Sequence, residues 1–458
     1  MLKVFNTLSG QKEELKPLKE NKVNLFVCGP TVYDSAHLGH ARTYLAFDMI
    51  AKYLKAQGFK VNYLQNITDI DDKIIQRAKE KNISTKELAQ TFEKEYLADM
   101  KSLKIDSVTK YARATDHIKE IISQIKRLKE KGFAYQAKDG IYYDIAKFKT
   151  YGQLAKRTVE QAEDGVSRID EAQDKRNKGD FCLWKFSKEG EPSWPSPFGQ
   201  GRPGWHIEDT AIAEKYFGLQ YDIHGGARDL VFPHHEAEIA QMEAISGKNP
   251  MVKYWLHTGF LTAKSQKMSK SLGNFTTIKE FLTKESPRLL RFFMLKHLYR
   301  SAIDWSEESL YQAKKELEKI DSLLDKCQSP DSKLKNLSLN KEIINTKEKE
   351  FNDCMADDFN TPQALAVLFE FSSKTNSCQF SKNDSQLSLK FLKGIDQYLG
   401  FIFWPKEKTP KKIMELVKQR EKQRKENKWS ESDETRKEIQ RLGWQVEDTS
   451  KGSKLKRI

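Results

Sequence analysis

Residues 27–41 of the chain read VCGPTVYDSAHLGHA, a stretch with one cysteine, two histidines and two glycines. Two kinds of site are compatible with it. Cys28, His37 and His40 could hold a metal ion, or the glycines and histidines could bind phosphate where a helix begins. The rest of the chain has to distinguish these alternatives, starting with the segments on either side.

The flanking residues predict a strand, a helix and a second strand. VNLFVCG, residues 23–29, has the apolar run of a short buried strand and leads into a Gly-Pro turn. From 38 to 57 apolar residues recur at helical spacing, and Gly58 ends the run. KVNYLQNI follows as a strand. Such a unit of about 45 residues is a βαβ motif, typical of a parallel sheet.

Further along, the pattern predicts helices and a hairpin, followed by an irregular segment. We expect helices over about 70–81, 85–100 and 117–131, and a hairpin that turns at 138–140. Residues 157–202 are irregular and rich in Gly, Pro and Trp, as in an insertion. A strand is predicted for YDIHGG (221–226) and a helix for PHHEAEIAQMEAI (233–245). After Leu289 the pattern is almost wholly helical, with a break at 328–340.

Composition indicates a soluble, globular chain. Its 458 residues allow about three domains. Hydrophobic residues make up 38% and charged residues 31%, a balance typical of a globular protein with a solvated surface. No apolar run approaches the ~18 residues that span a bilayer, and the start does not resemble a signal peptide. The five cysteines are scattered and odd in number, which argues against a disulfide framework and for a cytoplasmic location.

The positive charge is concentrated at the C-terminal end. The whole chain carries +14, and residues 406–458 hold 17 basic and 10 acidic side chains, or +7. A basic segment of this kind indicates a polyanionic partner, most often nucleic acid. A solvated tail without a partner is the alternative, and charge alone does not separate the two.

Two short motifs suit phosphate chemistry. In HLGH, Gly39 allows close backbone approach at a helix start, where His37 and His40 can donate to phosphate oxygens. In KMSKS, residues 267–271, two lysines beside serines suit a loop that grips a polyphosphate. Alone, the first motif could merely cap a helix and the second could be a basic turn. In this order, some 230 residues apart, they are far more specific.

The motifs and their order resemble class I aminoacyl-tRNA synthetases, and within that class the cysteinyl-tRNA synthetase family. The resemblance covers nearly the whole chain. The segments that carry it are FVCGPTVYDSAHLGHARTYLAFD, QNITDIDDKI, PSPFGQGRPGWHIE, DIHGGARDLVFPHHEAEIAQ, KMSKSLGNF, ADDFNTPQAL and DETRKEIQRLGWQVEDTSKG.

The resemblance implies an α/β fold with a Rossmann-like, parallel-sheet catalytic domain, an insertion, an all-α bundle and a small basic C-terminal domain. We expect the halves of the catalytic domain at 1–115 and 204–260, separated by the insertion, or connective peptide, at 116–203. The lysine loop and a stem-contact region would occupy 261–308. A tRNA-binding helical bundle would follow at 309–404 and an anticodon-binding domain at 405–458.

The implied reaction has two steps. L-Cysteine attacks the α-phosphate of ATP, giving cysteinyl-adenylate and pyrophosphate, and the cysteinyl group then moves to the terminal adenosine of tRNA-Cys. The resemblance assigns catalysis to His37, His40, Lys267 and Lys270. It assigns ATP binding to Gly29, His37, Gly39, His40, Gly225, Gly226, Asp229 and Lys270, with Mg²⁺ on the phosphates. A monomer without membrane contact is expected.

Selection of cysteine over serine requires more than shape, because the two differ by one atom. Zinc binds a thiolate well and a hydroxyl poorly. His234 and Glu238 are four apart on a predicted helix, which is compatible with a helical metal pair or with an exposed helix face. The resemblance makes them zinc ligands, adds Cys28, and places the substrate beside Cys28, Thr31, Thr68 and Trp205.

The chain departs from the family pattern at the fourth zinc position, where the family usually has a cysteine and this sequence has Asp209. Carboxylate oxygen is an acceptable zinc ligand, so we expect Asp209 to complete the set. Cys182 could in principle move in, but its surroundings favour a small buried residue. Asp71 and Asp72 could be a catalytic pair by type; placement at a helix N-terminus is the favoured interpretation.

Two other functions share some of these features. A ligase that joins cysteine to an amino sugar has the same adenylation core but resembles a synthetase cut short, and the helical bundle and basic tail argue against it. A catalytically inactive tRNA-binding relative is the second alternative, and the intact HLGH and KMSKS motifs argue against it.

Overall fold

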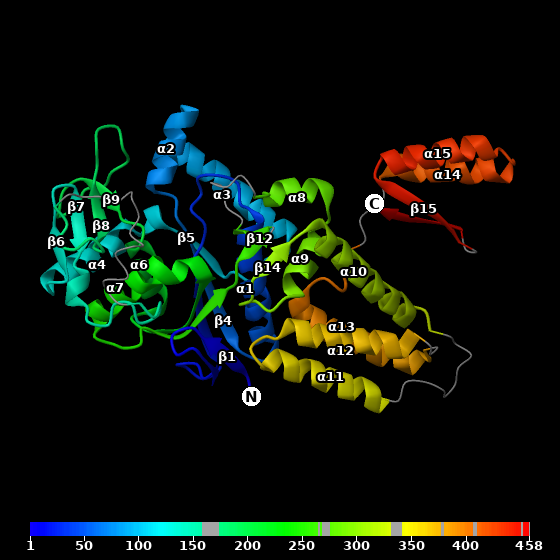
Figure 1. Ribbon diagram of the computed structural model, residues 1–458, viewed down its shortest axis with the longest axis horizontal. Coiled ribbons are helices and arrows are strands. Elements are labelled where there is room, and N and C mark those ends of the chain that lie inside the picture. The colour runs from blue at the N-terminus through cyan, green and yellow to red at the C-terminus, as the bar shows by residue number, and fades with distance from the viewer. Residues whose placement is uncertain are drawn as a thin grey trace. The chain divides into compact units, whose positions relative to one another are not determined.

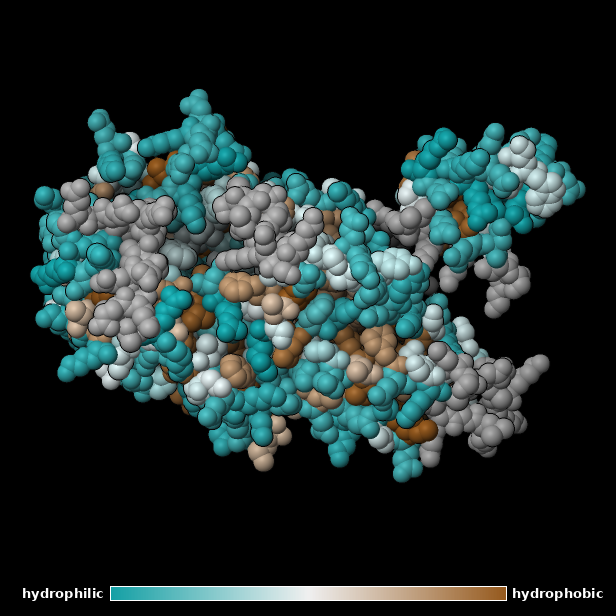
Figure 2. Space-filling view, in the orientation of Figure 1, coloured by the Kyte–Doolittle hydropathy of each residue, from teal (hydrophilic) through white to brown (hydrophobic). Residues whose placement is uncertain are grey.

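The computed structural model describes residues 1–157, 174–263, 266–267, 275–330, 341–376, 380–405, 410–449 and 452–457. The chain forms two compact units, Met1–Phe403 and Trp404–Ile458. Figure 2 shows hydrophilic side chains over most of the face drawn. Among the described residues, no helix combines the length and apolar character needed to cross a bilayer.

A five-stranded parallel sheet lies at the centre of the first unit, in the order β11-β10-β3-β4-β5. Its strands are β3 (Lys22–Val27), β4 (Lys60–Ile67), β5 (Lys110–Arg113), β10 (Tyr221–Ala227) and β11 (Val252–Thr258). Helix α1 (Leu38–Ala56) joins β3 to β4, which confirms the predicted βαβ unit and the α/β fold class.

The strand order creates a crevice where it reverses. From β3 the chain proceeds to β4 and β5 on one side, and β10 and β11 lie on the other. Register pairs Ile223 with Leu25 and Gly225 with Val27, so the carboxyl ends of β3 and β10 lie side by side. Ligands of open parallel sheets bind at such a switch point. Cys28 and the start of α1 follow directly from the end of β3.

Helix α1 is buried on nearly all sides because elements cover it on both flanks. One side faces the sheet, and the other packs against α9 (Pro287–Leu295) and α13 (Lys382–Leu399). The ring of Tyr53 meets those of Tyr398 and Phe359 edge-on, at centroid distances of 5.1 and 5.8 Å. The helix that begins at the HLGH motif is therefore fixed by both the sheet and the bundle.

The inserted region forms a four-stranded antiparallel sheet, seen at the left of Figure 1. Its strands are β6 (Ala134–Gln136), β7 (Gly140–Tyr143), β8 (Phe181–Phe186) and β9 (Gly201–Pro203). The hairpin predicted to turn at 138–140 is confirmed as β6–β7. The expectation that 157–202 is irregular was wrong for β8 and β9. Strand β8 pairs with β7, which lies about 40 residues earlier, and with β9. A pattern within a short stretch of sequence does not show such a pairing.

The remaining helices of this region surround the two sheets. They are α2 (Asp72–Lys81), α3 (Thr85–Ser102), α4 (Ile118–Glu130), α6 (Ile207–Phe217) and α7 (Glu236–Ser246). Helix α7 begins at Glu236 rather than at 233 as expected. Phe232 is extended (φ −136°, ψ 132°) since Pro233 follows it, and a wide turn, Val231–His235, then leads into the helix.

A small sheet and a helical bundle complete the first unit. β12 (Leu261–Ala263) lies between β13 (Gln266–Lys267) and β14 (Ile303–Trp305), and α8 (Ile278–Lys284) precedes α9. The bundle contains α10 (Glu307–Gln328), α11 (Lys341–Ala356), α12 (Thr361–Asn376) and α13. This confirms the helical pattern predicted after Leu289. At the N-terminus, β1 (Lys3–Asn6) and β2 (Gln11–Glu14) form a hairpin.

The second unit has its own core. Helices α14 (Lys411–Lys425) and α15 (Trp429–Arg441) pack on a hairpin of β15 (Trp444–Thr449) and β16 (Gly452–Arg457). Buried apolar residues hold it together: Ile413, Leu416, Val417, Ile439, Trp444 and Val446. Arg420 binds both carboxylate oxygens of Asp448, at 2.7 and 2.9 Å. The exact boundaries proposed for the functional domains stay predictions.

Candidate active site

The two histidines of HLGH stack on each other at the start of α1. Their ring centroids lie 4.0 Å apart, and the backbone N–H of His37 donates to Nδ1 of His40 at 3.1 Å. Burial, with a contribution from His37, lowers the pKa of His40 well below its usual value, so the ring is neutral. Because Nδ1 accepts, the ring proton is on Nε2, which is left as a donor.

The electrostatics of the helix start favour an anion. The first turn of α1, which lies wholly in the described part of the chain, carries no acidic side chain. The partial positive charge of the helix N-terminus is therefore not neutralised locally. A Cβ at Gly39 would lie 2.8 Å from the His37 ring, so glycine is required for the ring to lie over the helix start.

The other glycines predicted to bind ATP have close packing partners in the protein. A Cβ on Gly29 would meet the backbone oxygen of Asn66 at 1.7 Å, and one on Gly225 would meet the Phe47 ring at 2.3 Å. At Gly226 it would meet the His235 ring at 2.8 Å. Asp229 lies on the surface in the turn Arg228–Leu230 that follows β10. Their role toward ATP stays a prediction.

The described residues that follow the lysine loop lie next to the histidine motif, and Lys267 before the loop belongs to the small sheet. Lys267 ends β13, where its backbone pairs with Thr262. Lys270 lies outside the described residues. After the loop, the carbonyl of Thr276 accepts from the N–H of Leu38 at 3.0 Å, and the N–H of Ile278 donates to Ala36 at 2.8 Å. Backbone hydrogen bonds thus join the segment after the lysine loop to the start of the histidine motif and the residue before it.

All four predicted zinc ligands meet at the switch point. His234 Nε2 lies 3.0 Å from Glu238 Oε1 and 3.1 Å from Asp209 Oδ2. Cys28 Sγ lies 3.8 Å from Glu238 Oε1. All four are buried. The spacing of four between His234 and Glu238 brings them together although His234 belongs to the turn before α7.

The charges around this cluster fit a bound cation. Burial raises the pKa of Cys28 well above its usual value and that of Glu238 to about 7. Burial opposes protonation of His234, but Glu238 and Asp209 outweigh it and raise the pKa of His234 to about 10. Asp209 Oδ1 and Glu238 Oε2 are buried acceptors without a hydrogen bond, and Nε2 of His224 lies 3.3 Å from the latter. Such groups are costly unless a cation is bound, and thiol, imidazole and carboxylate ligands suit zinc.

Sequence reasoning missed a second set of buried side chains around the same point. Cys28 Sγ lies 3.0 Å from Nε2 of His235 and 3.3 Å from Nε2 of His224. The ligand atoms of Cys28, His234, His235 and Glu238 all lie within 4.8 Å of one another. Five of the chain's nine histidines fall between 206 and 257, and that clustering was the available signal.

These additional histidines are held by partners on several elements. His235 Nδ1 lies 2.8 Å from His257 Nε2, and His257 Nδ1 lies 2.8 Å from Thr7 Oγ1. The hydroxyl of Tyr221 lies 2.6 Å from His224 Nδ1. These rings are buried, and their contacts hold them around Cys28.

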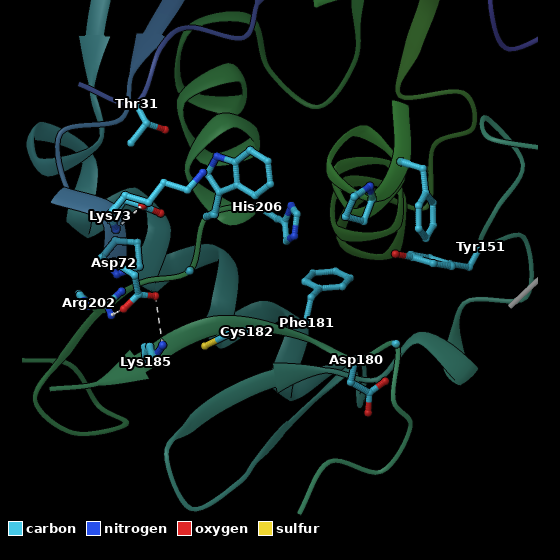
Figure 3. A pocket seen from close by; sticks show the side chains of 17 residues that line it. Thr31, Asp72, Lys73, Tyr151, Asp180, Phe181, Cys182, Lys185, Arg202 and His206 are labelled. Carbon is cyan, nitrogen blue, oxygen red and sulfur yellow. Dashed lines mark hydrogen bonds and ion pairs between the residues drawn. The ribbon is translucent and has the colours of Figure 1, made fainter. Parts of the chain in front are cut away.

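A pocket opens beside the cluster, between the catalytic sheet and the inserted strands (Figure 3). Trp205 stands at its edge, stacked on His234 at a centroid distance of 4.4 Å and 41% exposed. Thr31 lines the pocket, whereas Thr68 lies behind it, buried, and donates from its hydroxyl to Glu208. Thr31 and Thr68 are neighbours through backbone pairing.

Cys182 lines the far wall of this pocket and packs with Tyr135 and Tyr142, away from the histidine cluster. Asp71 caps α2 by accepting from the N–H of Lys73 at 2.8 Å, and Asp72 binds Lys185 at 3.1 Å and Arg202. Asp71 and Asp72 therefore have the helix-terminal placement that was favoured over a catalytic pair.

Comparison with known proteins agrees with this geometry. The family model of the class I (C) tRNA synthetase catalytic domain matches residues 14–315, and that of the DALR domain matches residues 350–403. Methionyl-tRNA synthetase of Mycobacterium tuberculosis superposes with a TM-score of 0.61 at 14% identity, covering 83% of this chain and 90% of its own. LeuRS of Agrobacterium radiobacter K84 gives 0.62 at 10%, covering 85% of each chain.

The fold and the catalytic-domain match define a class I tRNA synthetase. Cysteine–tRNA ligases of Thermococcus gammatolerans and Methanococcus maripaludis are each 46% identical to this chain, over all of it and over 99% and 100% of their own lengths. That of Pyrococcus horikoshii is 45% identical over 100% of this chain and 99% of its own. The chain belongs to the cysteine–tRNA ligase family.

Proposed function

We propose that the chain joins L-cysteine to the terminal adenosine of tRNA-Cys at the expense of ATP. The observation that carries the proposal is the juxtaposition, at one sheet switch point, of a helix start built for phosphate and a buried Cys–His–carboxylate cluster built for a thiol-binding metal. Family membership over the full length supports the same reaction.

In the first step, a carboxylate oxygen of cysteine attacks the α-phosphorus of ATP, and the bond to pyrophosphate breaks. His40 donates from Nε2 to a phosphate oxygen, beside His37 and the N–H groups of the first turn of α1. Lys267 and Lys270 neutralise the departing phosphates, which Mg²⁺ also binds. The ATP side of the site is lined by Gly29, Gly39, Gly225, Gly226 and Asp229.

Cys28, Asp209, His234 and Glu238 would hold zinc, and zinc bound there would supply a preference for the substrate thiolate over a hydroxyl. Trp205 stacks on His234 and walls the amino-acid pocket together with Thr31, and Thr68 supports Thr31 from behind through their backbone pairing. His224 and His235 contact Cys28 and fix its orientation.

In the second step, a ribose hydroxyl of the terminal adenosine attacks the cysteinyl carbonyl and AMP leaves. The bundle and the basic C-terminal unit would bind tRNA. A DALR match over 350–403 and the +7 charge of 406–458 support this assignment. We propose a monomeric enzyme that acts in the cytoplasm.

The test is cysteine-dependent ATP–pyrophosphate exchange followed by charging of tRNA-Cys. Both activities are expected, with serine inactive in exchange. Exchange without charging would favour the amino-sugar ligase, and charging of an amino sugar would then establish it. Binding of tRNA without exchange would favour an inactive relative.

A further inference from the structure

Arg42 lies in α1, two residues past His40, and its side chain is wholly buried. Its guanidinium donates only to backbone carbonyls, among the described residues, at Met294 (2.8 Å), Leu298 (2.6 Å), Tyr299 (2.9 Å) and Ser301 (3.4 Å). No described carboxylate pairs with it. A buried cation without a counter-ion is costly. The position of Arg42 in the core is therefore best explained by the backbone segment that its guanidinium holds.

The carbonyls that Arg42 binds belong to one continuous segment that leads toward the lysine loop. This segment, the end of α9 and the loop 296–302, runs into β14. β14 pairs in parallel with β12, Leu261 with Ile303 and Ala263 with Trp305. β12 in turn pairs with β13, whose last residue is Lys267.

Close contacts tie the segment to the catalytic sheet at the same place. The N–H of Gly259, just after β11, donates to the carbonyl of Tyr299 at 2.9 Å. A Cβ at Gly259 would lie 2.2 Å from the carbonyl oxygen of Ser301, another Arg42 acceptor. The N–H of Ile303 donates to Phe260 at 2.9 Å. Arg42 therefore fixes the base from which β12 and β13 extend.

The residues that follow the lysine loop are attached to the start of α1, one turn before Arg42. Thr276 and Ile278 bond to Leu38 and Ala36, on either side of His37. Both described flanks of the loop, the one that ends at Lys267 and the one that starts at Phe275, thus take their positions from the first two turns of α1.

From this connectivity we propose that Arg42 is a positioning residue for adenylate formation. It holds the base of β12 and β13, the second of which ends in Lys267, against the helix that carries the two histidines, and adenylate formation would depend on that attachment. Arg42 itself does not touch substrate. The inference rests on the proposed cysteine–tRNA ligase function, and it adds that the second step, which no longer involves pyrophosphate, is independent of Arg42.

The experiment compares Arg42→Gln and Arg42→Lys with a matched control, Arg291→Gln. Arg291 is equally buried and also binds backbone carbonyls, those of Leu399 and Leu103, together with Asp48, but it binds none in the loop 296–302. All rate constants are expressed per active site, by titration with cysteine and ATP, so that loss of folded protein does not register as slow catalysis.

We expect Arg42→Gln to slow single-turnover adenylate formation by about tenfold to a hundredfold, the cost of misplacing reacting groups by about 1 Å. Transfer from preformed cysteinyl-adenylate to tRNA should stay within about twofold of the parent protein, and Arg42→Lys should fall between. Arg291→Gln should lower thermal stability and leave both rate constants within about twofold.

A double-mutant cycle with Lys270→Ala identifies the route of the effect. If Arg42 acts through the lysine loop, adding Arg42→Lys to Lys270→Ala should change adenylate formation little, because the group being positioned is already gone. Additive losses, equal slowing of both steps, or the same selective loss in Arg291→Gln would overturn the inference. If the parent protein lacked cysteine-dependent exchange, the proposed function itself would fail; normal parent activity with any of these three results would defeat only the role of Arg42.

Discussion

At the residue scale, the affinity of the proposed site for zinc depends on Asp209. It is buried, and its Oδ2 lies 3.1 Å from Nε2 of His234. The sequence resemblance predicts a cysteine at this position. Carboxylate and thiolate carry the same formal charge, but the oxygen is a harder donor and holds zinc less tightly. Selectivity for a thiol substrate should nevertheless survive, since it depends on the bond between zinc and the substrate sulfur.

We therefore predict that the purified protein contains zinc and that Asp209→Cys loses it to a chelator more slowly than the parent protein does. Elemental analysis and a chelator time course measure the two quantities. Selection of cysteine over serine in pyrophosphate exchange should be similar in both proteins. Active protein, prepared without chelator, that holds less than about a tenth of an equivalent of zinc would contradict the proposed ligand set.

Lys270 offers a second prediction at this scale. Lys270→Ala should slow adenylate formation by roughly a hundredfold, the usual scale for removing one donor that stabilises developing charge. Lys267→Ala provides the comparison within the same motif. Thermal unfolding should be unchanged in both variants. Undiminished exchange in folded Lys270→Ala protein would remove Lys270 from the catalytic set.

At the element scale, helix α3 places two acidic groups one turn apart, beside a lysine of α8. Asp99 is buried on α3, and one of its carboxylate oxygens has no hydrogen bond. One turn earlier, Glu95 pairs with Lys279 of α8 at 3.1 Å. Burial, and then the charge of Glu95, raise the pKa of Asp99 to about 7, and Lys279 opposes the shift.

This shift predicts a pH-dependent effect of Asp99→Asn. In the unfolded chain Asp99 ionises near its ordinary pKa of about 3.9, whereas in the folded protein it ionises near 7. The parent protein therefore loses stability as the pH rises through this window, and the loss is complete above it. Asp99→Asn avoids the loss, so its melting temperature should exceed the parent's at pH 8 by several degrees and match it near pH 4. Asp325→Asn, at an exposed position of α10, is the control and should show no such divergence.

The elements that sequence could predict are those whose signal is local. α1, β4 and the β6–β7 hairpin carry their periodicity and turns within a few residues, and they occur where expected. β8 could not be predicted from its surroundings because its pairing partner lies in β7. Helix α7 starts at Glu236 rather than at 233 because the wide turn Val231–His235 comes before it. At the site, the motifs indicated Cys28 and His234, but His224 and His235 reach Cys28 only through the tertiary fold.

At the scale of the whole molecule, the chain separates into two units with separate cores. The principal core of the first unit includes residues from Val4 to Ile402, and the core of the second begins at Ile413. Because no described residue beyond 403 belongs to the first core, we expect truncation after 405 to leave that core intact. The second unit holds half of the net charge, +7 of +14.

We predict that deletion of residues 406–458 spares cysteine-dependent pyrophosphate exchange and weakens charging of tRNA-Cys. The residues proposed for adenylation all fall, by number, within the first unit, Met1–Phe403, whereas the basic segment would supply phosphate contacts to tRNA. Each contact that is lost removes a released counterion, so the affinity of the truncated protein for tRNA should also depend less steeply on salt concentration. Exchange rates, charging rates and tRNA affinity over a series of salt concentrations measure these effects.

The comparison of the two assays separates folding from recognition. A truncated protein that loses exchange as well as charging would show that the first unit depends on the second for its stability, contrary to the separation of their cores. A truncated protein that charges tRNA at the parent rate and with the parent salt dependence would make residues 406–458 a solubility element. Selective loss of charging, with a shallower salt dependence, is the result that the charge distribution and the two separate cores require.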